Sequence, residues 1–195
     1  MRLIVFGPTG GTGLELLSQG LAAGHEMTAF SRRAFDTQAR IVLGDVHDRA
    51  AVAEAIRGHD VVLSALGTRP WRHVDICSQG IASILAGSPR RVIAMSSLGV
   101  GEPKAGLIVR MGAALLLRKA FRDKLVMERM LEESSVPWIV VRPGFLTNGA
   151  ARGRWRVADD GTLGNGKISR ADTATFMLQQ VASDEWLRKR PVVVR

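Results

Sequence analysis

The 195-residue sequence is short of several residue types, and each shortage excludes a class of protein or chemistry. It contains no tyrosine, so no phenolic hydroxyl can act as a general acid. Its single cysteine, Cys77, excludes an internal disulfide framework. We expect Cys77 to be a buried structural thiol on an apolar helix face rather than a nucleophile. The four histidines are dispersed without the spacing of a metal site, so we expect no bound metal.

Long hydrophobic runs are also missing. The first apolar run, which ends at Phe6, is too short for the apolar region of a signal peptide. The most apolar stretch, residues 105–117, is interrupted by Arg110 and is shorter than a bilayer span. We therefore expect a cytoplasmic protein with no membrane span.

Charge is the strongest compositional bias, because 27 lysine and arginine residues against 18 acidic residues give a net charge of +9. Such a balance suits a nucleic acid, an anionic membrane or a phosphorylated ligand. The arginines are scattered over all segments of the chain, and no nucleic-acid recognition motif is present. We therefore expect a small-molecule partner and no nucleic acid. The composition leaves the oligomeric state open, and a monomer is compatible with it.

Short apolar segments alternate with segments of helical periodicity along the chain. We predict strands at residues 2–6, 27–30, 41–43, 61–65, 91–95, 138–141 and 192–194, and helices at 11–23, 48–56, 75–85, within 111–133, and at 171–181. Purely apolar strands that alternate with helices indicate a parallel sheet covered on both faces. We predict an α/β fold with a doubly wound parallel sheet. Residues 1–195 would form one domain, in which residues 145–195 are an extension on the substrate side.

A glycine-rich loop directly follows the first strand and opens the first helix. It reads Gly7-Pro8-Thr9-Gly10-Gly11-Thr12-Gly13, with the spacing G-x-x-G-x-x-G. Glycines allow a tight turn and the close approach of a pyrophosphate, and a helix N-terminus offers free N–H groups and a positive dipole end. The context predicts a dinucleotide phosphate site at Gly7, Thr9, Gly10, Gly11, Thr12 and Gly13. The alternative is a purely structural turn.

The end of the second strand indicates which dinucleotide binds. An acidic side chain there would hold the ribose diol of NAD, whereas this chain has Arg32 and Arg33 after Ser31. Two guanidinium groups suit a 2′-phosphate, so we predict NADP(H) as the cofactor. Arg32 is the better candidate because it stands nearer the strand end. The alternative is an exposed basic turn.

Several segments together resemble the atypical short-chain dehydrogenases/reductases, and in particular their flavin-reductase and biliverdin-reductase-like members. They are IVFGPTGGTG, GHEMTAFSR, VLGDVHD, ALGTR, the Ser96-Ser97 pair, VRPGFLTNG and ISRADTATFML. The resemblance covers nearly the whole chain. It implies an NAD(P)-binding Rossmann fold, NADP as cofactor and hydride transfer.

The resemblance also implies cofactor contacts at the ends of later strands. Asp45 and Val46 would border the adenine, although Asp45 could equally cap a turn. Leu66, Gly67 and Thr68 follow the fourth strand, where the cofactor would cross the sheet edge. Pro143, Gly144 and Phe145 would contact the nicotinamide end, unless Phe145 simply packs in the core. Ser96 is a further expected contact.

The family's usual catalytic set of Ser, Tyr and Lys is incomplete here. The resemblance places Ser97 and Lys124 in it, but Ala120 stands four residues before Lys124, where the tyrosine belongs. Ser96 competes with Ser97 for the place facing the nicotinamide, because strand alternation lets one of them point into the cleft. Lys124 would hold the nicotinamide ribose; the alternative is a solvated helix lysine.

The missing acid restricts the acceptor. Reducing a ketone makes a strongly basic alkoxide that needs a proton donor, whereas a flavin or a tetrapyrrole spreads the incoming charge over a large π-system. The sequence therefore favours an NADPH-dependent reductase of a flavin or tetrapyrrole-like acceptor. The alternative is an NADP-binding redox sensor without turnover, for which the same absence is expected.

Overall fold

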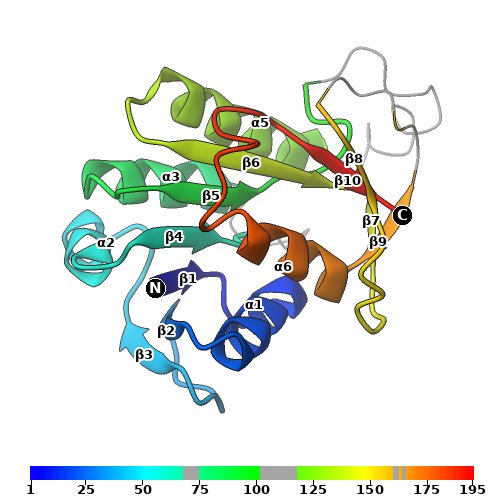
Figure 1. Cartoon of the computed structure of the whole chain (residues 1–195). Helices are drawn as coiled ribbons and strands as arrows, with labels where there is room; N and C mark the ends of the chain where they lie inside the picture. Colours follow the sequence, from blue (N-terminus) through cyan, green and yellow to red (C-terminus); the bar gives the residue numbers. More distant parts are fainter. Residues whose placement is uncertain (68–74, 102–117, 160–162, 164–165) are drawn as a thin grey trace.

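The computed structural model describes residues 1–67, 75–101, 118–159, 163 and 166–195 (Figure 1). The strands are β1 (Arg2–Phe6), β2 (Glu26–Ser31), β3 (Arg40–Leu43), β4 (Val61–Ser64), β5 (Val92–Met95), β6 (Trp138–Pro143), β7 (Phe145–Thr147), β8 (Arg156–Ala158), β9 (Lys167–Ser169) and β10 (Val192–Val194). The helices are α1 (Gly11–Ala22), α2 (Arg49–Ile56), α3 (Ile76–Ala86), α5 (Arg118–Glu133) and α6 (Arg170–Gln179). None of these helices is long and apolar enough to cross a membrane.

The main sheet has the order β3-β2-β1-β4-β5-β6-β10-β8, and its pairs are parallel except for β8 against β10. The reversal of strand order between β1 and β4 is the signature of a doubly wound sheet. The predicted α/β fold with a mostly parallel sheet is therefore confirmed.

Alternate strand residues build two apolar layers, one on each face of the sheet. In β1, Leu3 and Val5 join a buried cluster with side chains of α1 and α6, whereas Ile4 and Phe6 join the cluster on the face of α2, α3 and α5. Because both faces are covered, β1, β4, β5 and β6 are buried almost throughout. This explains why these strands are apolar at every position rather than alternating.

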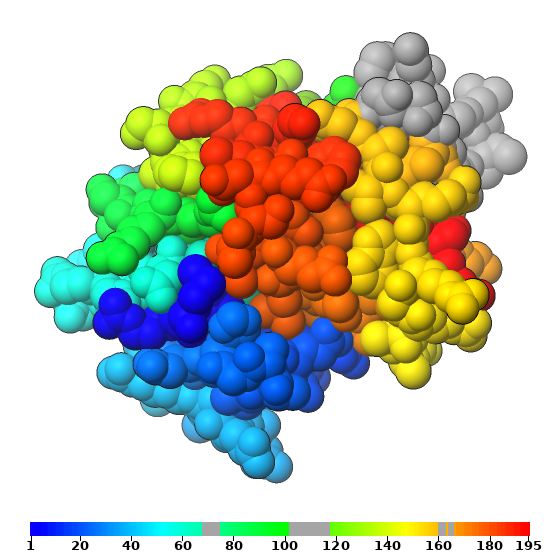
Figure 2. Space-filling model, in the orientation of Figure 1, coloured from blue at the N-terminus to red at the C-terminus, as the bar shows by residue number. Residues whose placement is uncertain are grey.

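The C-terminal extension returns to the N-terminal half of the molecule. β10 adds to the sheet beside β6, and α6 packs along α1, so that orange residues lie against blue ones in Figure 2. The expected helix at 171–181 and the last strand are confirmed. β7, β8 and β9 were not among the predicted strands, because each mixes polar and apolar residues, whereas the equally short β10 is a run of valines.

Candidate functional site

A groove of about 400 Å³ lies at the carboxyl ends of the neighbouring strands β1 and β4, where the strand order reverses. Ligands of doubly wound folds bind at such a switch point. Eight of the expected cofactor residues line this groove: Gly7, Thr9, Gly10, Arg32, Arg33, Val46, Leu66 and Gly67. Pro8, Phe30, Ser31, Gly44, Ala65 and Ile76 complete the lining. Thr68 lies outside the described residues.

The glycines of the loop serve different purposes. Gly7 has a φ of +77°, and a Cβ there would lie 2.6 Å from the Ala65 carbonyl oxygen. A Cβ on Gly13 would lie 2.2 Å from the carbonyl oxygen of Gly7, so both glycines are needed to close the turn. A Cβ on Gly10 would meet one atom, at 3.4 Å, which leaves its surface open to the groove. Gly11 faces the side chain of Arg170, a neighbour that the sequence did not indicate.

The N-terminus of α1 is open to a ligand. Gly10 is its N-cap residue and provides no side-chain hydrogen bond. By contrast, Asp48 caps α2 and Ser169 caps α6 through their side chains. Thr12 is buried in the first turn. First-turn N–H groups without a protein cap, next to an open glycine, fit the pyrophosphate of a dinucleotide.

The basic turn after β2 flanks the same groove. Arg32 and Arg33 are both exposed. Asp45 accepts hydrogen bonds from the backbone N–H of His47 at 3.0 Å and from its Nδ1 at 2.6 Å. These bonds, with the charges of His47 and Arg32 nearby, hold the pKa of the Asp45 carboxyl below its usual range. Asp45 thus shapes the turn that carries Val46, which is buried at the groove.

Ser97 and Lys124 are in direct contact. Nζ of Lys124 donates to Oγ of Ser97 at 2.7 Å and to the carbonyl oxygen of Ser96 at 2.8 Å. Lys124 is half-buried, so the solvated alternative is wrong. Burial lowers the pKa of its ammonium group, an effect opposed by the Cys77 thiol, Glu128 and Asp123. The Ser96 hydroxyl is instead buried without a hydrogen-bond partner among the described residues.

Asp123 fixes the position of Lys124 relative to the groove, a role that the sequence did not indicate. Its buried carboxylate accepts hydrogen bonds from the backbone N–H groups of Cys77 and Ser78, both at 2.9 Å. It therefore caps α3 from the neighbouring helix α5. Cys77 is fully buried, as expected, and its thiol donates to the carbonyl of Leu66 in the groove wall.

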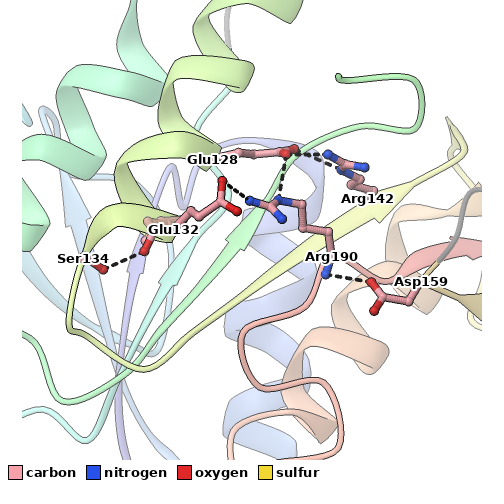
Figure 3. A network of polar contacts seen from close by, with 7 residues as sticks. Glu128, Glu132, Ser134, Arg142, Asp159 and Arg190 are labelled. Atoms are coloured by element: carbon pink, nitrogen blue, oxygen red, sulfur yellow. Dashed lines mark hydrogen bonds and ion pairs between the residues drawn. The ribbon is translucent and has the colours of Figure 1, made fainter. Parts of the chain in front are cut away.

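A buried ion-pair network holds α5 one turn further on (Figure 3). Arg142 of β6 donates through Nε and Nη2 to the two carboxylate oxygens of Glu128, at 3.2 and 2.6 Å. Nε of Arg190 lies 3.4 Å from the same carboxylate, and its Nη2 lies 2.8 Å from Glu132. Glu128 is 1% exposed, so its charge depends on these partners. The sequence did not indicate this network, because Glu128, Arg142 and Arg190 lie on different parts of the fold.

Pro143 ends β6, and Gly144 and Phe145 follow it. Pro143 is buried, and its carbonyl accepts from the N–H of Leu98. A Cβ on Gly144 would lie 2.3 Å from the carbonyl oxygen of Gly166, so packing of the extension already requires glycine there. Phe145 is 58% exposed, which excludes the core-packing alternative and leaves its ring free for a ligand.

Comparison with known proteins places this geometry in context. Residues 7–184 match a family described as NAD(P)H-binding. The chain is 26% identical to the uncharacterized protein YwnB of Bacillus subtilis strain 168, over 100% of this chain and 98% of YwnB. Its fold is similar to that of ChuY, an anaerobilin reductase from Escherichia coli O157:H7, with a TM-score of 0.84, 23% identity and coverage of 100% and 97%. SP1627 of Streptococcus pneumoniae TIGR4, a proposed NADH-flavin reductase, has a TM-score of 0.82, 20% identity and coverage of 100% and 99%.

Proposed function

Because the chain belongs to the NAD(P)H-binding family, we propose that it is an NADPH-dependent oxidoreductase that reduces a flavin or tetrapyrrole-like conjugated acceptor. The observation that carries the proposal is the groove itself, in which the open Gly10 and the uncapped N-terminus of α1 face the same space as Arg32 and Arg33. Gly10 and the N-terminus of α1 suit a pyrophosphate, and the two arginines suit a 2′-phosphate.

The catalytic roles proposed for Ser97 and Lys124 follow from their hydrogen bond. The bound nicotinamide supplies a hydride. Oγ of Ser97 accepts a hydrogen bond from Lys124, so its own O–H is directed elsewhere, and no acceptor for it is found among the described residues. Ser97 can therefore donate a hydrogen bond to the acceptor, while the ammonium group of Lys124 stabilises negative charge on the serine oxygen.

The nature of the acceptor follows from what the site lacks. The sequence has no tyrosine, and Ala120 occupies the position four residues before Lys124. A serine hydroxyl is a weak acid, so this site suits an acceptor whose charge is delocalised. The reductase descriptions of ChuY and SP1627 support the same class of reaction. We also propose that residues 145–195, including the exposed ring of Phe145, flank the acceptor.

The test is oxidation of NADPH or NADH, followed by absorbance, with FMN, FAD or biliverdin as acceptor. We expect faster oxidation of NADPH, and we expect Arg32→Asp to remove that preference. Arg129→Asp, at an exposed arginine of α5 outside the extension, is the matched control for net charge. Tight NADPH binding without oxidation by any acceptor would refute the reductase and favour a redox sensor without turnover.

A further inference from the structure

Arg170 brings a cation from the C-terminal extension to the phosphate loop. It is the first residue of α6, and its side chain crosses the first turn of α1. A Cβ on Gly11 would lie 2.6 Å from Cδ and 3.0 Å from Nε of Arg170. The arginine stem thus fills the space that a side chain at position 11 would take. This explains why the loop has glycine there without invoking close approach of a ligand.

The helix that carries Arg170 is fixed against α1. Gln19 of α1 donates to the carbonyl of Ala171 at 3.1 Å and accepts from the hydroxyl of Thr175 at 2.8 Å. The N-terminus of α6 is itself capped, because Ser169 accepts from the N–H of Asp172 at 2.9 Å. Since α1 and α6 begin at the same edge of the sheet, these contacts set Arg170 beside the N-terminus of α1 (Figure 1).

The guanidinium group is oriented but not neutralised. Nη1 of Arg170 donates to Oδ1 of Asn148 at 2.5 Å, a neutral amide. No carboxylate of the described residues lies within ion-pair distance of it. Arg91, Arg142 and Arg190 each face at least one carboxylate. Arg170 is therefore a half-buried cation beside the uncapped N-terminus of α1. The guanidinium charge and the positive end of the helix dipole together make the electrostatic potential there positive.

We propose that Arg170 binds the pyrophosphate of the dinucleotide and that Asn148 orients it for this role. A diphosphate is the ligand that both positive features favour, since it accepts charge-assisted hydrogen bonds from a guanidinium and from backbone N–H groups together. The inference rests on the proposed binding of the dinucleotide at this loop. It assigns the extension a share of the cofactor site in addition to the acceptor side.

The test uses three ligands to distinguish binding of the pyrophosphate from binding of the 2′-phosphate. Dissociation constants of NADPH, NADH and 2′-AMP are measured by calorimetry for the wild type and for Arg170→Met, which keeps a stem on Gly11 and removes the charge. We expect the dissociation constants of NADPH and NADH to rise by the same factor, about tenfold or more. That of 2′-AMP, which has no pyrophosphate, should stay unchanged. Arg32→Asp should show the converse pattern, with NADPH and 2′-AMP weakened and NADH spared.

Two controls separate binding from folding and from net charge. Arg129→Met removes a charge from an exposed position of α5, outside the extension, and should leave all three constants unchanged. The melting temperature of Arg170→Met should equal that of the wild type; if this variant is unstable, Arg170→Lys replaces it and should bind NADPH less tightly than the wild type. Wild-type-like binding of NADPH and NADH by Arg170→Met would overturn the inference while leaving the proposed function intact. If the wild type binds neither dinucleotide, the proposed function and the inference both fail.

Discussion

Nζ of Lys124 donates to Oγ of Ser97 across 2.7 Å, which joins helix α5 to the segment that follows β5. In the family that the sequence resembles, a tyrosine belongs four residues before this lysine, and here the position is Ala120. Lys124 and Ser97 are in direct contact in a site that has no tyrosine. The missing tyrosine is the clearest difference between this site and the usual catalytic set of the family.

Lys124 should make stability depend on pH below 10.5. Burial lowers the pKa of Lys124 in the folded protein, whereas the unfolded chain keeps a value near 10.5. Between the two values the unfolded state binds more protons, so the free energy of unfolding rises with pH in that interval. The difference in unfolding free energy between the wild type and Lys124→Met, measured by urea denaturation at several pH values, should increase toward pH 10.5. Lys119→Met, at an exposed lysine of the same helix, should give a flat difference; a flat difference for Lys124→Met would contradict the prediction.

Asp123 should contribute more to stability than an ordinary helix cap. Asp123→Ala removes two hydrogen bonds to the N-terminus of α3 and should cost about 2 kcal/mol of unfolding free energy. Asp48→Ala removes the single bond of Asp48 to the N–H of Ala51 at an exposed cap and should cost about 1 kcal/mol. Chemical denaturation of both variants checks the order, and an equal or smaller loss for Asp123→Ala would count against its bridging role.

Glu128 should be among the residues least tolerant of charge removal. Glu128→Gln leaves Arg142 and Arg190 without the buried carboxylate that they share, and we expect a loss of about 3 kcal/mol. The matched control is Glu54→Gln, because Glu54 pairs with Arg57 at 2.8 Å on the surface. That pair should contribute less than about 0.5 kcal/mol. Comparable midpoints of urea unfolding for the two variants would disprove the difference.

Substitutions of Gly10 and Gly13 in the glycine-rich loop should have different effects, one on ligand binding and the other on stability. Gly10→Ala adds a Cβ where the nearest atom is 3.4 Å away and φ is −77°, so stability should change by less than about 0.5 kcal/mol. NADPH binding should nevertheless weaken about tenfold, because the new methyl group occupies the face open to the pyrophosphate. Gly13→Ala meets the Gly7 backbone at 2.2 Å and should cost about 3 kcal/mol. Melting curves and NADPH titrations of both variants test this, and unimpaired binding by Gly10→Ala would show that the pyrophosphate does not lie there.

Local patterns were enough to predict most of the fold. The apolar strands and the glycine loop depend on residues close together in the chain, so the local sequence is enough to predict them. The residues lining the groove follow from the same logic, because the carboxyl ends of parallel strands meet at one edge. The strands β7, β8 and β9 were missed because their sequences are not apolar runs, unlike the equally short β10.

The sequence by itself determined the strand and helix order, the phosphate loop, the basic turn at Arg32 and the absence of a tyrosine acid. Only the tertiary structure decided that Lys124 reaches Ser97 and that Arg170 lies on Gly11. It also decided that Asp123 caps α3 by accepting from the N–H of Ser78, 45 residues away in the chain. These contacts join residues far apart in the chain. Whether such groups meet depends on how α5 and α6 pack on the sheet, and no local periodicity encodes that packing.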